Sequence, residues 1–183
     1  MKNLKNIIVT TIILTIICAI ATAGLALTND LTAGRIEKLA AEAEQKAMGR
    51  IIKADEFTMS TIEFNGEKTY YTAVSGGKTV GYIFTVSSHG YGGDVKVMTG
   101  IGMDGKIIAI EVLDATNETP GLGQNVAKKT FWEQFKGQQG QLAVKQEITP
   151  VTGATISSKA VTNSVNEALK LYDAIVKEDG NNG

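Results

Sequence analysis

The pattern of apolar and polar positions changes its period along this chain of 183 residues. Residues 7–27 carry no charged side chain and, at about 1.5 Å per residue, can span about 30 Å, the thickness of a bilayer's hydrocarbon core. Apolar residues then recur at helical spacing from Ile36 to Ile51, which predicts an amphipathic helix. The last apolar stripe, from Val161 to Val176, has spacings of three and four and predicts a second amphipathic helix.

Between these helices the period falls to two, which predicts β-strands rich in Val, Ile, Thr and Tyr. The expected strands cover residues 69–74, 80–87, 94–101 and 106–113. Gly76-Gly77 and Asp104-Gly105 separate neighbouring strands as tight hairpin turns do, so the pairing should be antiparallel. A further helix is expected over residues 126–137, with Phe131, Trp132 and Phe135 facing the core. Helices before and after an antiparallel sheet make an α+β fold.

These elements predict how the chain divides into parts. The parts are a cytoplasmic N-terminal tail (1–6), a transmembrane anchor (7–27), an amphipathic connecting helix (28–56), the main domain (57–178) and a disordered polar tail (179–183). A cleaved signal peptide is the alternative for the apolar run, and Ala21-Thr22-Ala23 offers a cleavage signature. The apolar core of a signal peptide normally has only about 7–15 residues, which favours the anchor. A long C-terminal domain translocates largely regardless of charge, so we expect it outside the cytoplasm.

Composition narrows the classes of function. The net charge of −1 gives no electrostatic reason to expect nucleic-acid binding. The only cysteine, Cys18, excludes an intrachain disulfide framework and any site that needs several cysteine ligands, such as an iron–sulfur cluster. The only histidine, His89, excludes the usual histidine-based metal clusters. We therefore predict no metal site, and any electron transfer should use an organic cofactor.

Two glycine-rich segments differ in what they indicate. Residues 100–105 match the spelling of a dinucleotide-binding loop, but that motif requires a helix after it, and here a strand follows. We therefore reject a Rossmann site. Residues 87–93 form a glycine-rich loop between two predicted strands. This loop is either a flexible connection or a backbone that a planar ligand can approach, with Tyr91 or His89 beside it.

A turn rich in hydroxyl groups precedes the last predicted helix. Residues 147–158 hold five hydroxyl side chains, those of Thr149, Thr152, Thr155, Ser157 and Ser158. A helix N-terminus presents free N–H donors and a partial positive charge, so an anion is expected there. The alternative is an ordinary Ser/Thr helix cap.

Taken together, these loops and this turn resemble the covalent FMN-binding domain. The resemblance rests on Glu118-Thr119-Pro120-Gly121-Leu122-Gly123, followed about thirty residues later by Thr152-Gly153-Ala154-Thr155. Residues 90–105 are similar to the segment that precedes the acidic loop in that family. The domain occurs in the G subunit of Rnf ion-translocating oxidoreductases and in the C subunit of the sodium-pumping NADH:quinone reductase. The compact length of this chain favours the Rnf protein.

The resemblance implies a covalent cofactor and a set of residues around it. A flavin transferase would join the phosphate of FMN to Thr155 through a phosphoester. The implied cofactor-binding residues are Thr152, Gly153, Ala154 and Ser157 near the phosphate, and Glu118, Thr119, Leu122 and Gly123 in the wall around the isoalloxazine. His89, Tyr91 and Lys159 are further candidates, and no residue is expected to be catalytic. The family usually has His or a basic residue around Thr116-Asn117, so this chain departs from the pattern there.

The implied function is electron transfer on the extracytoplasmic side of the cell membrane. An Rnf complex moves electrons between reduced ferredoxin and NAD while it translocates sodium ions or protons. One membrane helix cannot form an ion conduit, so other subunits of the pump must be partners. Two alternatives remain: the corresponding protein of the quinone reductase, and a membrane-anchored binding or sensory module with non-covalent flavin or none.

Overall fold

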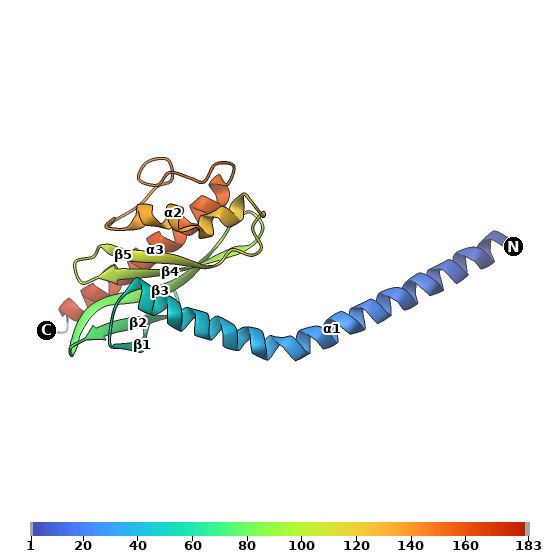
Figure 1. Ribbon diagram of the computed structural model, residues 1–183, viewed down its shortest axis with the longest axis horizontal. Coiled ribbons are helices and arrows are strands. Elements are labelled where there is room, and N and C mark those ends of the chain that lie inside the picture. The colour runs from blue at the N-terminus through green and yellow to red at the C-terminus, as the bar shows by residue number, and fades with distance from the viewer. Residues whose placement is uncertain (1, 182–183) are drawn as a thin grey trace. The chain divides into compact units, whose positions relative to one another are not determined.

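A computed structural model describes the backbone of residues 2–181 and forms two compact units, residues 1–43 and 44–183. The elements follow each other along the chain as a long helix, five strands, three short helical turns and a final helix (Figure 1). They are α1 (Lys2–Ile51), β1 (Glu56–Glu63), β2 (Glu67–Ser75), β3 (Lys78–His89), β4 (Asp94–Gly102), β5 (Ile107–Asp114), η1 (Gly123–Ala127), α2 (Lys129–Trp132), η2 (Glu133–Phe135) and α3 (Thr155–Asn181). The α+β fold predicted from the sequence is confirmed.

The first unit is the larger part of α1, which is long and apolar enough to cross a membrane. Several of its threonines bond back to their own helix. The hydroxyl groups of Thr10, Thr11 and Thr15 each donate to the carbonyl oxygen four residues earlier, at 2.9 Å. This bonding leaves fewer unpaired polar groups in an apolar surrounding, as a membrane span requires.

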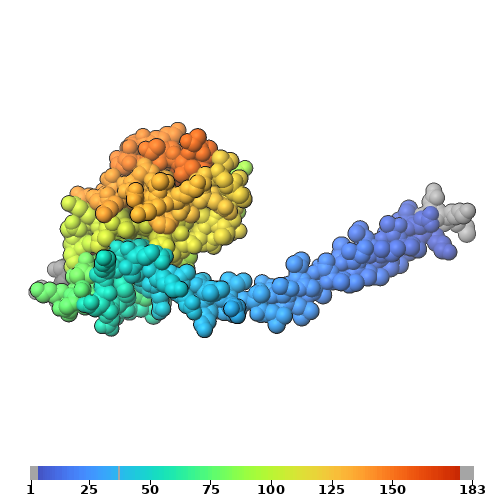
Figure 2. All heavy atoms as spheres, viewed as in Figure 1, coloured from blue at the N-terminus to red at the C-terminus, as the bar shows by residue number. Residues whose placement is uncertain are grey.

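The second unit is built on one antiparallel sheet whose strands lie in sequence order, β1-β2-β3-β4-β5. Gly76 and Gly77 both have positive φ angles, 57° and 74°, as the two central residues of a tight β2–β3 hairpin turn require. Strand β1 was not predicted, because only one of its eight residues is buried and its apolar pattern is weak. The segment after β5 lies along the β5 edge, and the β1–β2 hairpin forms the opposite edge (Figures 1 and 2).

Helix α3 covers one face of the sheet and builds the main core. Six positions of the predicted stripe are buried, Val161, Val165, Ala168, Leu169, Tyr172 and Ile175, whereas Val176, which we also expected there, is exposed. The six buried residues pack with Phe84 of β3 and with Val97 and Ile101 of β4, each of which has no exposed surface. The helix therefore has a fixed position on the sheet, which in turn fixes the position of its first turn. The helix continues to Asn181, into the stretch we predicted as a tail, and residues 182–183 lie outside the described part.

The opposite face of the sheet is covered by the end of α1, within the second unit. Ala47, Met48, Ile51 and Ile52 pack against Ala73, Ile83 and Met98 of the sheet in a separate apolar cluster. Arg50 strengthens this contact, because its Nε atom donates to the Glu111 carboxylate of β5 at 3.0 Å. The part of the predicted connecting segment from residue 44 to residue 52 thus belongs to the folded domain.

Glycine at position 100 is needed for this contact. A Cβ atom at Gly100 would overlap with Cγ2 of Ile51, and both residues are buried. We expect Gly100→Ala to destabilise the domain by about 1–3 kcal/mol, because the added methyl group overpacks the contact. The measurement is thermal or urea unfolding. Gly49→Ala is the control: its Cβ would meet nothing within 4 Å, so this helical substitution should leave stability unchanged or raise it by up to about 1 kcal/mol. Equal stability of the two variants would contradict the packing explanation.

The region between β5 and α3 is less regular than the sequence predicted. In place of one helix over 126–137 there are the three short turns η1, α2 and η2. The aromatic residues have the predicted role, since Phe131 and Phe135 are buried in the main core. Trp132 is half-buried, and its Nε1 atom donates to the Val126 carbonyl at 2.8 Å.

Candidate functional site

Three segments that are far apart in the sequence surround one cavity of about 580 Å³. They are the glycine-rich β3–β4 turn, the loop between β5 and η1, and the turn that leads into α3. The lining residues are Tyr91, Thr119, Leu122, Gly123, Gly153, Ala154, Thr155, Ile156 and Ser157. Apart from Ile156, all of these residues were candidates from the sequence.

The first turn of α3 presents the polar end of the cavity. The first intrahelical bond runs from the Ser158 N–H to the Ala154 carbonyl at 2.9 Å. By helix geometry, the N–H groups of Thr155, Ile156 and Ser157 have no intrahelical acceptor. They also have no other acceptor among residues 2–181. The half-buried Thr155 is therefore a hydroxyl side chain beside three available N–H donors.

Ser158 holds this turn in shape and is not free for a ligand. Its hydroxyl accepts the Val151 N–H at 3.0 Å and donates to the Ala154 carbonyl at 2.9 Å. Gly153 allows the turn, because its φ angle of 76° lies in the left-handed region that favours glycine. Its close neighbour is the side chain of Leu122, so the turn contacts the 118–123 loop directly.

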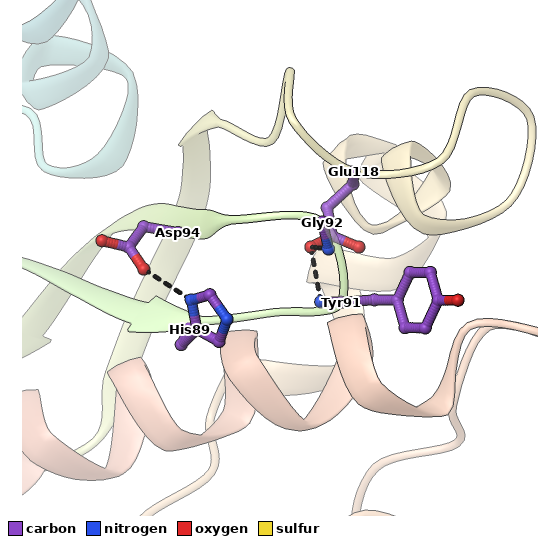
Figure 3. A network of polar contacts seen from close by, with 5 residues as sticks. All are labelled: His89, Tyr91, Gly92, Asp94 and Glu118. Atoms are coloured by element: carbon purple, nitrogen blue, oxygen red, sulfur yellow. Dashed lines mark hydrogen bonds and ion pairs between the residues drawn. The ribbon is translucent and has the colours of Figure 1, made fainter.

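Glu118 lies behind the cavity wall and is 1% exposed. Its Oε1 atom accepts the Tyr91 N–H at 2.8 Å and the Gly92 N–H at 3.1 Å (Figure 3). Its Oε2 atom accepts a hydrogen bond from the Ser157 hydroxyl. We expected this side chain in the wall around a flavin ring. In the structure it is not among the residues that line the cavity, and it joins the three segments that form this cavity.

The β3–β4 turn is rich in glycine because the Glu118 carboxylate and its loop leave no room for larger side chains there. A Cβ atom at Gly90 would overlap with Oε1 of Glu118, and one at Gly92 would overlap with the backbone carbonyl of Asn117. Gly123 is restricted in the same way, because a Cβ atom there would lie 2.5 Å from Oε2 of Glu118. Close packing against Asn117 and Glu118 therefore accounts for a glycine-rich loop that the sequence left ambiguous.

Apolar side chains stand at the mouth of the cavity. Tyr91, Leu122 and Ile156 are 70%, 46% and 52% exposed, which is unusual for large apolar groups gathered at one place. Ile156 was not among the candidates, because it belongs to the same helix as the buried stripe yet points away from the core. Among the residues that the structure describes, no charged side chain lines the cavity.

Besides Glu118, three further candidates from the sequence lie outside the cavity lining. Thr152 is exposed and borders a separate hollow of about 360 Å³. Lys159 is exposed on α3. His89 is exposed at the end of β3, where its Nδ1 atom lies 3.0 Å from Oδ1 of Asp94 (Figure 3).

The residues present suit a ligand with a flat apolar part and an anionic end. A volume of about 580 Å³ lies within the range of small-molecule and cofactor sites, about 300–1,000 Å³. The exposed apolar groups at the mouth can cover a ring system. The three N–H donors of α3 can bind a phosphate without a cationic side chain.

Comparison with known proteins identifies the same region. Residues 90–170, which include every residue that lines the cavity, match the FMN-binding domain family, and residues 1–51 match the RnfG N-terminal region. The chain is 36% identical to the G subunit of a Na⁺-translocating ferredoxin:NAD⁺ oxidoreductase complex of Acetobacterium woodii, with 91% of each chain covered. It is 31% identical to the G subunit of an ion-translocating oxidoreductase complex of Methanosarcina acetivorans, covering 94% of this chain and 96% of the relative.

A further relative is matched over a shorter length. The chain is 40% identical to the G subunit of a proton-translocating ferredoxin:NAD⁺ oxidoreductase complex of Clostridium ljungdahlii. That alignment covers 64% of each chain, which is just under two thirds of the relative's length.

Proposed function

We propose that this chain, which belongs to the RnfG family of ion-translocating oxidoreductase complexes, transfers electrons through an FMN joined to Thr155 by a phosphoester. The observation that carries the proposal is the position of Thr155. Its hydroxyl lines the cavity at the first turn of α3, beside three N–H groups without an acceptor in the described chain. A covalent flavin at this site makes the chain a redox component of a larger complex.

The first turn of α3 supports the phosphate end of the cofactor. A phosphodiester anion at a helix N-terminus gains about 0.3–1 kcal/mol, and up to about 2 kcal/mol when partly buried. Gly153 and Ala154 have little bulk, which leaves room for a flavin transferase to reach Thr155. Thr152 and Lys159 lie on exposed surface next to this turn, where they can contact the transferase or add a positive charge.

The apolar side chains at the mouth of the cavity support a site for the isoalloxazine ring of the cofactor. Tyr91, Leu122 and Ile156 can cover the isoalloxazine, and Thr119 and the backbone of Gly123 line the wall between the ring and the phosphate. When bound, FMN supplies the electron-carrying group. The protein holds it in a site whose mouth is formed by exposed side chains, so a redox partner can approach the ring edge.

The proposed membrane anchor and the proposed covalent bond both support a flavin domain outside the cytoplasm. We propose that residues 1–6 face the cytoplasm, residues 7–27 cross the cell membrane and the flavin domain, residues 57–178, lies outside. Free FMN is scarce there, so a reversibly bound cofactor would dissociate by mass action, and a covalent bond prevents this loss. Protease added to intact spheroplasts should therefore digest the domain, whereas protection of the domain would contradict this orientation.

The Rnf complex is favoured over the quinone reductase by the N-terminal segment. Residues 1–51 match the RnfG N-terminal region, and the relatives described above are named as G subunits of ion-translocating complexes. The partners would be the other subunits of a redox-driven ion pump. Purification of the tagged chain from its own membranes should recover ferredoxin-like iron–sulfur proteins, and their replacement by components of a quinone reductase would favour the alternative.

The covalent bond is tested by the mass of the denatured protein. The full chain, expressed together with a flavin transferase, should gain the mass of FMN less one water. Expression without the transferase should give the unmodified mass, which shows that the gain requires the enzyme. An unmodified chain in both preparations would contradict covalent attachment and would favour a binding module with non-covalent flavin or none.

A further inference from the structure

The buried Glu118 carboxylate has contacts that direct binding of a flavin does not explain. A carboxylate with 1% exposure is costly to bury unless hydrogen bonds or a cation compensate for the lost water. No Lys, Arg or His forms an ion pair with it among the described residues. Its compensation comes from two backbone N–H groups and the Ser157 hydroxyl. These three donors show which segments the side chain holds together.

The contacts form a bridge between the glycine-rich turn and α3, and Figure 3 shows its end at the turn. Oε1 binds the turn through Tyr91 and Gly92, and Oε2 binds the first turn of α3 through Ser157. Glu118 itself is fixed in its loop, because its backbone N–H donates to the Ala115 carbonyl at 3.1 Å. All three walls of the cavity therefore meet at one side chain.

Tyr91 depends on this bridge for its position. Tyr91 is 70% exposed, so packing against the core does little to hold it at the cavity mouth. Its backbone N–H, however, donates to Oε1 of Glu118 at 2.8 Å. This hydrogen bond fixes the backbone from which the ring projects.

We propose that Glu118 is a positioning residue that holds Tyr91 against the flavin site by tying the glycine-rich turn to the first turn of α3. The consequence for the flavin rests on the function proposed above, whereas the bridge itself exists without a cofactor. A purely structural Glu118 would affect unfolding of the whole domain but would not act specifically through Tyr91. Two measurements separate these roles.

The first measurement uses flavin-free protein and concerns only the bridge. In full-length chain made without the transferase, amide hydrogen exchange at Tyr91 and Gly92 is compared between the wild type, Glu118→Gln and Glu118→Ala. Loss of a hydrogen bond to a charged group should accelerate exchange at both amides by on the order of tenfold to a hundredfold in Glu118→Ala. Glu118→Gln, which keeps an acceptor oxygen, should give a smaller change. The control is the amide of Met98, in the inner strand β4, which should exchange at the same rate in every variant. If exchange at Tyr91 and Gly92 also stays at the wild-type rate in the variants, the proposal is overturned.

The second measurement uses the flavin-loaded full chain. A tyrosine close to a flavin quenches its fluorescence, so Tyr91→Leu should raise the emission. Glu118→Ala should also raise it although Tyr91 is still present, and the double variant should be no brighter than Tyr91→Leu alone. His89→Ala is the control, because His89 ends β3 just before the turn and does not line the cavity, and the emission of this variant should equal that of the wild type.

The outcomes distinguish this proposal from the proposed function. A chain that never acquires flavin contradicts the function, and the exchange measurement then decides on the bridge alone. Emission that stays at the wild-type level in Glu118→Ala, or a double variant brighter than Tyr91→Leu, would overturn the positioning role. If Glu118→Ala fails to fold, Ser157→Ala and Glu118→Gln replace it. Ser157→Ala removes the contact between Oε2 of Glu118 and α3 but leaves both bonds of Oε1 to the turn, and it should raise the emission. The absence of a rise in both variants would overturn the proposal.

Discussion

Thr155→Ala is expected to abolish covalent flavin completely. The alanine has no oxygen to form the phosphoester, so the denatured protein should show the unmodified mass and no flavin fluorescence after electrophoresis. The fold should be retained, because the half-buried Thr155 side chain lies at the cavity and outside the main core. The measurement is the intact mass of the variant after expression together with the transferase.

Thr152→Ala is the matched control in the same turn. It also removes a threonine hydroxyl, but that side chain is exposed and borders a different hollow. The control should keep the full FMN mass, although a lower yield is expected if the transferase contacts this residue. Loss of the adduct in Thr152→Ala with retention in Thr155→Ala would move the attachment site to residue 152.

The second large effect is expected when the end of α1 is removed. A chain that begins at Asp55 lacks Met48, Ile51 and Ile52, whose burial stabilises the fold by about 1.5–3 kcal/mol each, or about 5–9 kcal/mol together. It also uncovers residues of the sheet that have no exposed surface, such as Ile83 and Met98. The loss is comparable to the whole stability of a typical domain, about 5–15 kcal/mol. This chain should therefore be unfolded at room temperature, as circular dichroism would show.

The control for this prediction begins at Glu44, where the second compact unit starts. It keeps the apolar cluster and the Arg50–Glu111 contact but contains none of the residues proposed to cross the membrane, 7–27. The chain that begins at Glu44 should be soluble and should unfold cooperatively. Cooperative unfolding of the chain that begins at Asp55 would show that the helix end is dispensable for the domain.

Strong periodicity and local turn chemistry made much of the fold predictable. Four of the strands and their hairpins were identified because side-chain alternation and turn glycines are local properties of the sequence. The long helices were identified by their apolar stripes. Strand β1 was missed because it is exposed at an edge of the sheet, where no burial imposes alternation. The 126–137 region was predicted as one helix because its aromatic spacing suits a helix as well as it suits three successive short turns.

The sequence predicted which residues form the candidate site better than it predicted how those residues are arranged. Small residues and hydroxyl groups identified the turn before α3, and the structure brings most of the candidates around one cavity. The inward position of Glu118 could not be read from its loop, because an acidic residue next to a Pro-Gly turn is usually exposed. Ile156 carried no distinguishing pattern. Attachment to Thr155 and the roles of the surrounding residues stay predictions until the experiments above are done.

The order of the strands has a consequence for how the protein matures during synthesis. Each strand pairs with the next one in the chain, so the sheet can form hairpin by hairpin as residues 56–114 emerge, and local contacts of this kind favour rapid folding. Among the elements that the structure describes, α3 is made last, because it begins only at Thr155. Until α3 has been made, the sheet exposes the apolar face that this helix covers, and the cavity lacks the residues of the helix's first turn. We therefore expect the proposed cofactor attachment at Thr155 to follow the synthesis of α3.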